Sequence, residues 1–263
     1  MQDTMKIKIG LVLLFYLFMN VSAFAQSPRV KVPSYFGLQV RPILPTRFIG
    51  NPELKLQTDA NDPLFVTTTL RQRLGYSFGA TVRAGITKLI AFETGINFNQ
   101  RNFDVEMELP DSALYAKTDL SFINYDIPIN ALFYIRLAER WYMNASLGLA
   151  LTFSPTNIRV DSNPRSVHYF SQTGLVDSKV GLDLNANIGF EFRTEKSGFF
   201  YLGGSGRVPF KPIFTLLSEH YYQGFATKIY GDVDGTFLSI DFKYFFPNIE
   251  NKGEQFKHGP IVQ

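Results

Sequence analysis

Apolar and polar residues alternate strictly over residues 180–193. Every even-numbered position from Val180 to Phe192 is apolar, whereas the odd-numbered positions carry Gly, Asp, Asn, Glu or Arg. Side chains on a β-strand point to opposite faces with a period of two, so this segment predicts a strand with one apolar and one polar face.

The same alternation recurs along the chain and predicts eight strands. They cover residues 35–43, 76–85, 89–103, 122–137, 141–153, 180–193, 199–210 and 236–246. Their connections differ in length in a regular way. Three are tight turns, at 86–88, 138–140 and 195–198, and four are long segments, at 44–75, 104–121, 154–179 and 211–235. Tight turns on one side and long loops on the other are typical of bacterial outer-membrane barrels.

The composition of the polar face favours a lipid environment for the apolar one. Gly, Asn, Ser and Thr dominate it, with few charges of either sign. Small residues suit the narrow interior of an eight-stranded barrel, whereas the surface of a water-soluble barrel would carry more Lys and Glu. We therefore expect an all-β fold, an eight-stranded antiparallel up-and-down transmembrane β-barrel, in preference to a soluble barrel of the lipocalin type.

The ends of the chain indicate export. Lys6 and Lys8 precede an apolar run, and Ala23-Phe24-Ala25 supplies a small-x-small cleavage pattern. This predicts a signal peptide over residues 1–25, followed by the barrel at 26–247 and a polar periplasmic tail at 248–263. The predicted location is the cell outer membrane.

Composition removes several classes of function. The chain has no cysteine and only three histidines, and it shows no paired-histidine metal motif. We therefore expect no metal site and no cofactor. The net charge is only +3, with no basic run that would favour a nucleic-acid partner.

The inward positions of the predicted barrel bring many charges together. A charge kept from bulk water must be paired or it costs several kcal/mol, so we expect an ion-paired plug. The expected network comprises Arg41, Arg83, Glu93, Arg101, Asp126, Arg136, Asp183, Glu191, Arg193, Arg207, Asp241 and Lys243.

The long loops hold the other candidate residues. Two histidines lie near Ser166 and Ser218, which leaves open a nucleophile–base site at the barrel rim. Aromatic loop residues can mark a surface that binds a partner or glycan, or they can pack the loops together. The candidate loop contacts are His168, Tyr169, Phe170, His220, Tyr221 and Tyr222.

Two segments carry a family resemblance. Phe122–Ile129, FINYDIPI, resembles a fourth strand of the Tyr-x-x-x-Pro type, with the spacing here shifted to Tyr125-Asp126-Ile127-Pro128. Residues 235–246, GTFLSIDFKYFF, resemble an aromatic-ended closing strand. Both resemble the outer-membrane β-barrel family common in Bacteroidota, which includes the PorT-like proteins, and hence an OmpA-type eight-stranded barrel domain. The resemblance implies the barrel fold and an outer-membrane location.

The function predicted from these patterns is non-enzymatic. The protein is expected to support the membrane or to bind a partner protein, glycan or lipid through its long loops. Expected partners are outer-membrane lipid and lipopolysaccharide, together with an envelope protein complex. The alternatives are a lipid-A-modifying hydrolase or acyltransferase with a histidine at the rim, and a narrow pore for small hydrophobic molecules.

Overall fold

The computed structural model describes residues 34–59, 65–87, 89–110, 113–162, 167–194 and 197–247. The predicted signal peptide and the predicted tail lie outside these ranges. Within them, no helix has the length and apolar character needed to cross a bilayer.

Nearly all of the described chain is β-structure. The strands are β1 (Ser34–Leu44), β2 (Glu53–Gln57), β3 (Thr67–Gln72), β4 (Gly75–Gly85), β5 (Ile90–Leu109), β6 (Leu114–Arg136), β7 (Trp141–Phe153), β8 (Ile158–Ser162), β9 (His168–Leu175), β10 (Val180–Arg193), β11 (Phe199–Pro209), β12 (Phe214–Tyr222), β13 (Phe225–Val233) and β14 (Phe237–Phe245).

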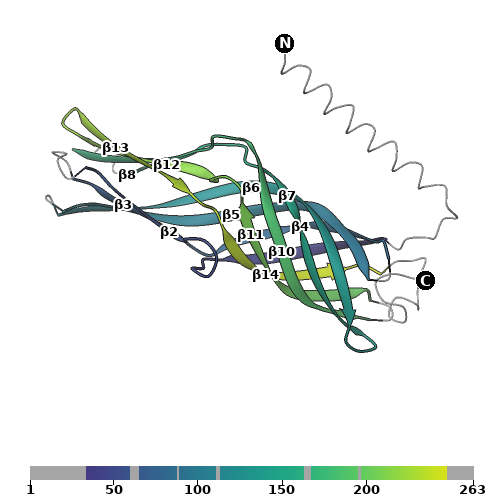
Figure 1. Cartoon of the computed structure of the whole chain (residues 1–263). Coiled ribbons are helices and arrows are strands. Elements are labelled where there is room, and N and C mark those ends of the chain that lie inside the picture. The colour runs from purple at the N-terminus through teal and green to yellow at the C-terminus, as the bar shows by residue number, and fades with distance from the viewer. Residues whose placement is uncertain are drawn as a thin grey trace, which may run out of the picture. The chain divides into compact units, whose positions relative to one another are not determined.

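Eight of these strands correspond to the eight predicted from the sequence. They pair in the order β5-β4-β1-β14-β11-β10-β7-β6, and β6 also pairs with β5, so each strand has two neighbours within the set (Figure 1). Every pairing is antiparallel, and the predicted all-β, up-and-down arrangement is confirmed. The three tight turns join β4 to β5, β6 to β7 and β10 to β11. We call this the turn end.

The alternation in the sequence becomes an alternation of exposure. On β10, Ile188 is 57% exposed and Phe190 is 50% exposed, whereas the neighbouring Glu191 is fully buried. The other strands of this set of eight repeat the pattern, with polar side chains directed inward and apolar ones outward. A surface that exposes so many large apolar side chains is the reverse of a water-soluble protein.

The prediction that residues 104–121 form a long loop is wrong. β5 continues to Leu109 and β6 begins at Leu114, so this segment is a paired hairpin. The other three predicted loops contain the hairpin β2–β3 and the strands β8, β9, β12 and β13. The sequence pattern did not predict these strands because their polar residues face outward, whereas the eight predicted strands carry apolar residues on that face.

Along β5, the inward-facing side chains change from polar to apolar. Asn99 and Arg101 point inward and are buried, but the next inward residues are Phe103 and Val105. β6 reverses at the same level: its outward residues change from Ile123 to polar or charged side chains toward its start. One continuous pair of strands therefore passes from an environment that favours apolar outward side chains to one that favours polar ones.

We call the part beyond this reversal the extension. It consists of residues 102–109 and 114–122 together with β2, β3, β8, β9, β12 and β13. β2 and β3 continue the sheet of β5, while β13-β12-β9-β8 form a separate four-stranded sheet. Figure 1 shows β8, β12 and β13 beside β3 at one end of the described chain.

The extension has a dry core of the kind found in water-soluble proteins. Its larger cluster contains Leu70, Phe103, Val105, Leu120, Phe122, Phe214, Leu216 and Val233. A second cluster contains Val66, Met107, Leu109, Ala116, Phe170 and Ile229. Residues from both sheets contribute to both clusters, so burial of apolar area holds the extension together.

Candidate functional site

The interior near the turn end holds a compact ionic cluster, the turn-end cluster. Arg83 contacts Glu93 at 2.6 Å (Nη2–Oε2) and Glu191 at 2.5 Å (Nη1–Oε2). Lys243 Nζ lies 2.5 Å from Glu93 Oε1, and Arg193 Nη2 lies 2.5 Å from Glu191 Oε1. Each carboxylate thus bridges two cations, and all five side chains are buried.

Aromatic rings line the same end of the interior. The guanidinium carbon of Arg83 lies 4.1 Å from the ring centroid of Phe245, and that of Arg193 lies 4.5 Å from the ring centroid of Tyr142. Phe199 stacks on Phe245 with centroids 4.5 Å apart. Cation–π contacts of desolvated groups add to the ion pairs. The alternation in the sequence also places these aromatic residues inward, but the predicted network contained only charged residues.

A second cluster, the Asp126 cluster, lies further along the interior. Arg207 donates to Asp126 at 2.6 Å (Nη1 to Oδ2), and Arg41 Nη2 lies 3.8 Å from the same oxygen. Asn97 and Asn99 donate to the two carboxylate oxygens at 2.7 Å and 2.6 Å. Asp126, on β6, is therefore held by side chains from three other strands, β1, β5 and β11. The asparagines were not among the predicted network residues, although the same alternation places them inward.

Two more predicted network residues receive hydrogen bonds mainly from hydroxyl groups. Asp183 accepts one from Thr152 at 2.8 Å, while Arg207 Nη1 lies 4.0 Å away. Asp241 accepts from Ser205 and Ser239, each at 2.9 Å.

The remaining two arginines lie at opposite ends of the barrel strands. Arg101 is buried where the extension begins, and it donates to the carbonyl of Gly235 and to Gln72 Oε1. Arg136 lies outside both clusters. It is exposed at the end of β6 and donates to the backbone carbonyls of Ala138 and Glu139. Its parity is inward, but the strand ends there, so water reaches the side chain.

Charge in the interior is nearly balanced among the described residues. The buried cations are Arg41, Arg83, Arg101, Arg193, Arg207 and Lys243, and the buried carboxylates are Glu93, Asp126, Asp183, Glu191 and Asp241. Buried charges must be paired and hydrogen-bonded to be tolerated. This arrangement fills the interior with fixed, mutually neutralising groups.

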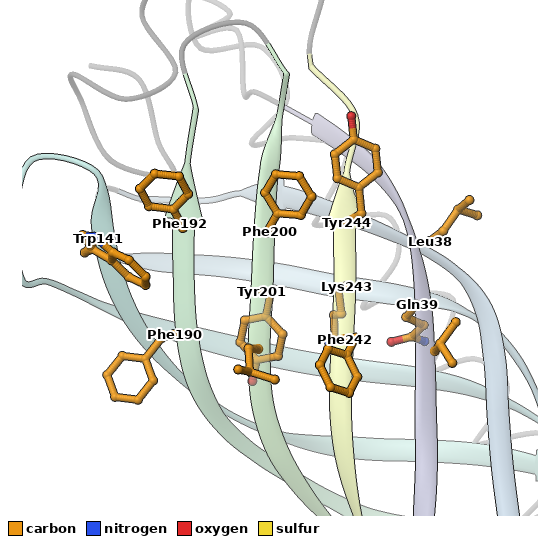
Figure 2. Close-up of a pocket in the computed structure, with 12 residues that line it drawn as sticks. Leu38, Gln39, Trp141, Phe190, Phe192, Phe200, Tyr201, Phe242, Lys243 and Tyr244 are labelled. Atoms are coloured by element: carbon orange, nitrogen blue, oxygen red, sulfur yellow. The ribbon is translucent and has the colours of Figure 1, made fainter.

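The outward face carries an aromatic groove near the turn end. Figure 2 shows Phe192, Phe200 and Tyr244 in a row across β10, β11 and β14, and the register makes them direct neighbours. Trp141 lies beside this row, with its ring centroid 4.9 Å from that of Phe192. The groove is lined almost entirely by apolar atoms. Aromatic girdles of this kind lie at membrane–water boundaries in transmembrane barrels.

The six candidate loop residues do not lie in loops. His168, Tyr169 and Phe170 belong to β9, and the other three belong to β12. Phe170 and His220 are buried in the extension, where their rings are 4.8 Å apart. The prediction of six exposed loop contacts is therefore corrected: side chains alternate between the core and the outer surface of one sheet.

His168 and His220 form a direct pair. His168 Nδ1 lies 3.1 Å from His220 Nε2, and the ring planes differ by 3° with centroids 5.3 Å apart. A centroid distance so much longer than the nitrogen distance places the rings edge to edge in one plane, joined by an N–H···N hydrogen bond. Only one proton fits between the two nitrogens, so the geometry disfavours a doubly charged pair.

Burial of the His220 ring, and then the nearby His168, lower the pKa of His220 to about 4. The unfolded chain has a histidine pKa of about 6.5, so between these values the unfolded state binds more protons. Stability is therefore fully present above pH 6.5 and falls as the pH drops toward 4. We expect urea unfolding of the extension to show this loss between pH 7.5 and 4.5, and His220→Gln to lack it. Equal pH dependence in both proteins would contradict the prediction.

Ser218, one of the two serines predicted to lie near a histidine, forms its hydrogen bonds with other side chains. The Ser218 hydroxyl contacts Thr68 Oγ1 at 3.1 Å and donates to Met107 Sδ at 3.2 Å, rather than to a histidine. Ser166 lies outside the described residues. Within the described ranges, no group of three or more His, Asp or Glu side chains could hold a metal ion.

No protein-family model matches the chain, and no curated protein matches it. Among solved structures, it is similar to the outer membrane protein OprG from Pseudomonas aeruginosa, with 12% identity and a TM-score of 0.47. The similarity covers 82% of this chain and 96% of OprG.

Proposed function

We propose that the protein is a non-enzymatic integral outer-membrane β-barrel with eight transmembrane strands and a filled interior. One observation carries the proposal: on the same strands, apolar residues face outward near the turn end and inward in the extension. Lipid selects the first arrangement, because an outward apolar side chain is favourable only where the surroundings are themselves apolar. Water selects the second, as in any soluble protein core.

The orientation follows from the positions of the turns. Bacterial barrels place short turns in the periplasm and long connections outside the cell. The turn end would therefore face the periplasm, and the extension would rise from the outer surface. An N-terminal signal peptide, as predicted from residues 1–25, fits this route of export.

The filled interior supports a structural or binding role in preference to transport. Aromatic rings and the turn-end cluster occupy one end, the Asp126 cluster follows, and the dry core of the extension lies beyond. A conducting pore would need these groups to separate. Membrane lipid and lipopolysaccharide would contact the outer face, and an envelope protein complex is a further proposed partner. Membership of the Bacteroidota PorT-like family remains a prediction from two sequence segments.

A pair of matched substitutions tests the lipid-facing surface. Leu147 is 57% exposed at the middle of β7, and Ser121 is exposed on the outward face of β6 in the extension. In a membrane, Leu147→Arg should destabilise the protein by about 2–4 kcal/mol. Ser121→Arg should stay within about 0.5 kcal/mol of wild type. Urea unfolding in lipid vesicles measures both values.

The two outcomes distinguish a lipid-facing surface from a water-facing surface. A water-soluble barrel would tolerate arginine at an exposed leucine, so equal and small effects of the two substitutions would overturn the proposal. A folded, monomeric mature chain in detergent-free buffer would do the same.

A further inference from the structure

The outer face of the β13-β12-β9-β8 sheet is a further surface that the core of the extension does not use. Register and alternation place three tyrosines on it, opposite to the buried Phe170 and His220. Tyr169 and Tyr221 are direct cross-strand partners on β9 and β12, and Tyr230 lies on β13. We propose that this face, the tyrosine platform, binds a neutral glycan chain. The inference deepens the proposed function and depends on surface display by the barrel.

The platform has an aromatic group at each end and a polar centre. Tyr221 and Tyr169 mark one end, the cross-strand pair Glu219 and Lys228 follows, and Tyr230 opposite Leu217 marks the other end. Four residues of strand separate the two aromatic ends, which is about 14 Å. A short oligosaccharide lying along β12 would therefore meet a ring, a hydrogen-bonding pair and a second ring in turn.

Four charged residues on this face form two ion pairs, and a fifth, Asp232, accepts a hydrogen bond from Thr215 Oγ1 at 2.6 Å. Lys228 Nζ lies 2.7 Å from Glu219 Oε1, and Arg159 Nε lies 3.1 Å from Asp161 Oδ1. Two matched pairs and one further carboxylate offer no positive field to a phosphate or a carboxylate. The side chains of Lys228, Arg159 and Asp161 are accessible enough to donate to or accept from hydroxyl groups, whereas Glu219 is almost buried beneath Lys228. This charge pattern matches a neutral, hydroxyl-rich ligand better than an anionic one.

Contacts hold the rings of Tyr169 and Tyr221, which lie at the end of the platform near the β12–β13 turn. Arg159 Nη2 donates to the Tyr169 hydroxyl at 3.3 Å, and the Tyr169 and Tyr221 centroids are 5.3 Å apart with planes inclined by 33°. Tyr230 is 70% exposed and presents its ring to solvent. Tyrosine offers an apolar face with few rotatable bonds, so little entropy is lost when a sugar ring stacks on it.

The outer face of the other sheet provides a contrast within the same extension. It carries a ladder of ion pairs, such as Arg71 with Glu106 at 2.8 Å and Arg73 with Asp104 at 3.1 Å. Its exposed large aromatic residue is Tyr115. The concentration of tyrosines on one face therefore distinguishes the platform from an ordinary solvated sheet, and Tyr115 provides a matched control.

Affinity electrophoresis of the purified full-length protein in detergent tests the proposal. The probes are three neutral polysaccharides (dextran, yeast mannan and galactan), with polygalacturonate as an anionic comparison. We expect at least one neutral probe to retard the wild type. Tyr221→Ala and Tyr230→Ala should each weaken that binding about tenfold, which corresponds to loss of one stacked ring. Tyr115→Ala should bind as the wild type does.

Several results would overturn the inference. They are no retardation by any neutral probe, equal retardation of the platform and control variants, or stronger binding of polygalacturonate. Binding of a protein through this face with no glycan binding would also overturn it.

Gln223 lies at the tip of the β12–β13 hairpin, and the chain lacks cysteine. Labelling Gln223→Cys on intact cells with an impermeant maleimide tests surface display separately, so failure of the membrane proposal can be distinguished from failure of glycan binding.

Discussion

Replacement of Asp126 by leucine is expected to lower the free energy of unfolding by about 3–5 kcal/mol, the usual cost of removing one partner of a buried ion pair. Asp126 accepts hydrogen bonds from Arg207, Asn97 and Asn99 and lies 3.8 Å from Arg41. Leucine would leave two buried guanidinium groups and two amide groups without their shared acceptor. Urea unfolding in lipid vesicles, followed by the fluorescence of the single tryptophan, Trp141, measures the loss.

An exposed ion pair serves as the control for this substitution. Arg71 and Glu106 are 2.8 Å apart in the extension, but the Arg71 side chain is 52% exposed. Solvent screens such a pair, so Glu106→Gln should cost less than about 1 kcal/mol. If Asp126→Leu costs no more than Glu106→Gln, the interior is hydrated and the description of a filled, ion-paired plug is wrong.

Truncation of Phe214 to alanine is expected to destabilise the extension by about 3–5 kcal/mol. Phe214 is 1% exposed, and its ring centroid lies 5.6 Å from that of Phe103 and 5.3 Å from that of Phe122. These rings come from different sheets, so the cavity would lie between the two sheets. We expect faster proteolysis of the extension in vesicles, while the eight strands that we propose to span the membrane stay protected.

Phe48 provides the matched control for this second prediction. It is 88% exposed, so Phe48→Ala removes the same atoms without opening a cavity. Its proteolysis rate should equal that of the wild type. Equal rates for Phe214→Ala and the wild type would contradict the assignment of a dry core, because a cluster that tolerates loss of its central ring does not hold two sheets together.

The sequence predicted with good accuracy which face of a strand each side chain occupies. The strict alternation on β10 placed Asp183, Glu191 and Arg193 on one face, and the structure has all three buried. Position at a strand end could not be read in the same way. Arg136 has inward parity, yet it is exposed because β6 ends at that residue.

Contacts between distant residues came only from the tertiary structure. His168 and His220 are 52 residues apart, and their pairing depends on the register between β9 and β12. The convergence of Asn97, Asn99 and Arg207 on Asp126 likewise depends on the order of strands around the circuit. A period of two fixes which side chains share a face, but it carries no information about which strands become neighbours.

The sequence by itself determined the strands of the barrel, their tight turns and the two faces of each strand, because a two-residue period is a local property of an extended backbone. Only the tertiary structure decided that the long segments continue as strands and that inside and outside exchange their chemistry between Arg101 and Phe103. The physical reason is that the two-residue period is the same whether the apolar face points inward or outward. Which face turns inward depends on whether lipid or water surrounds the strand and on which distant sheet covers it.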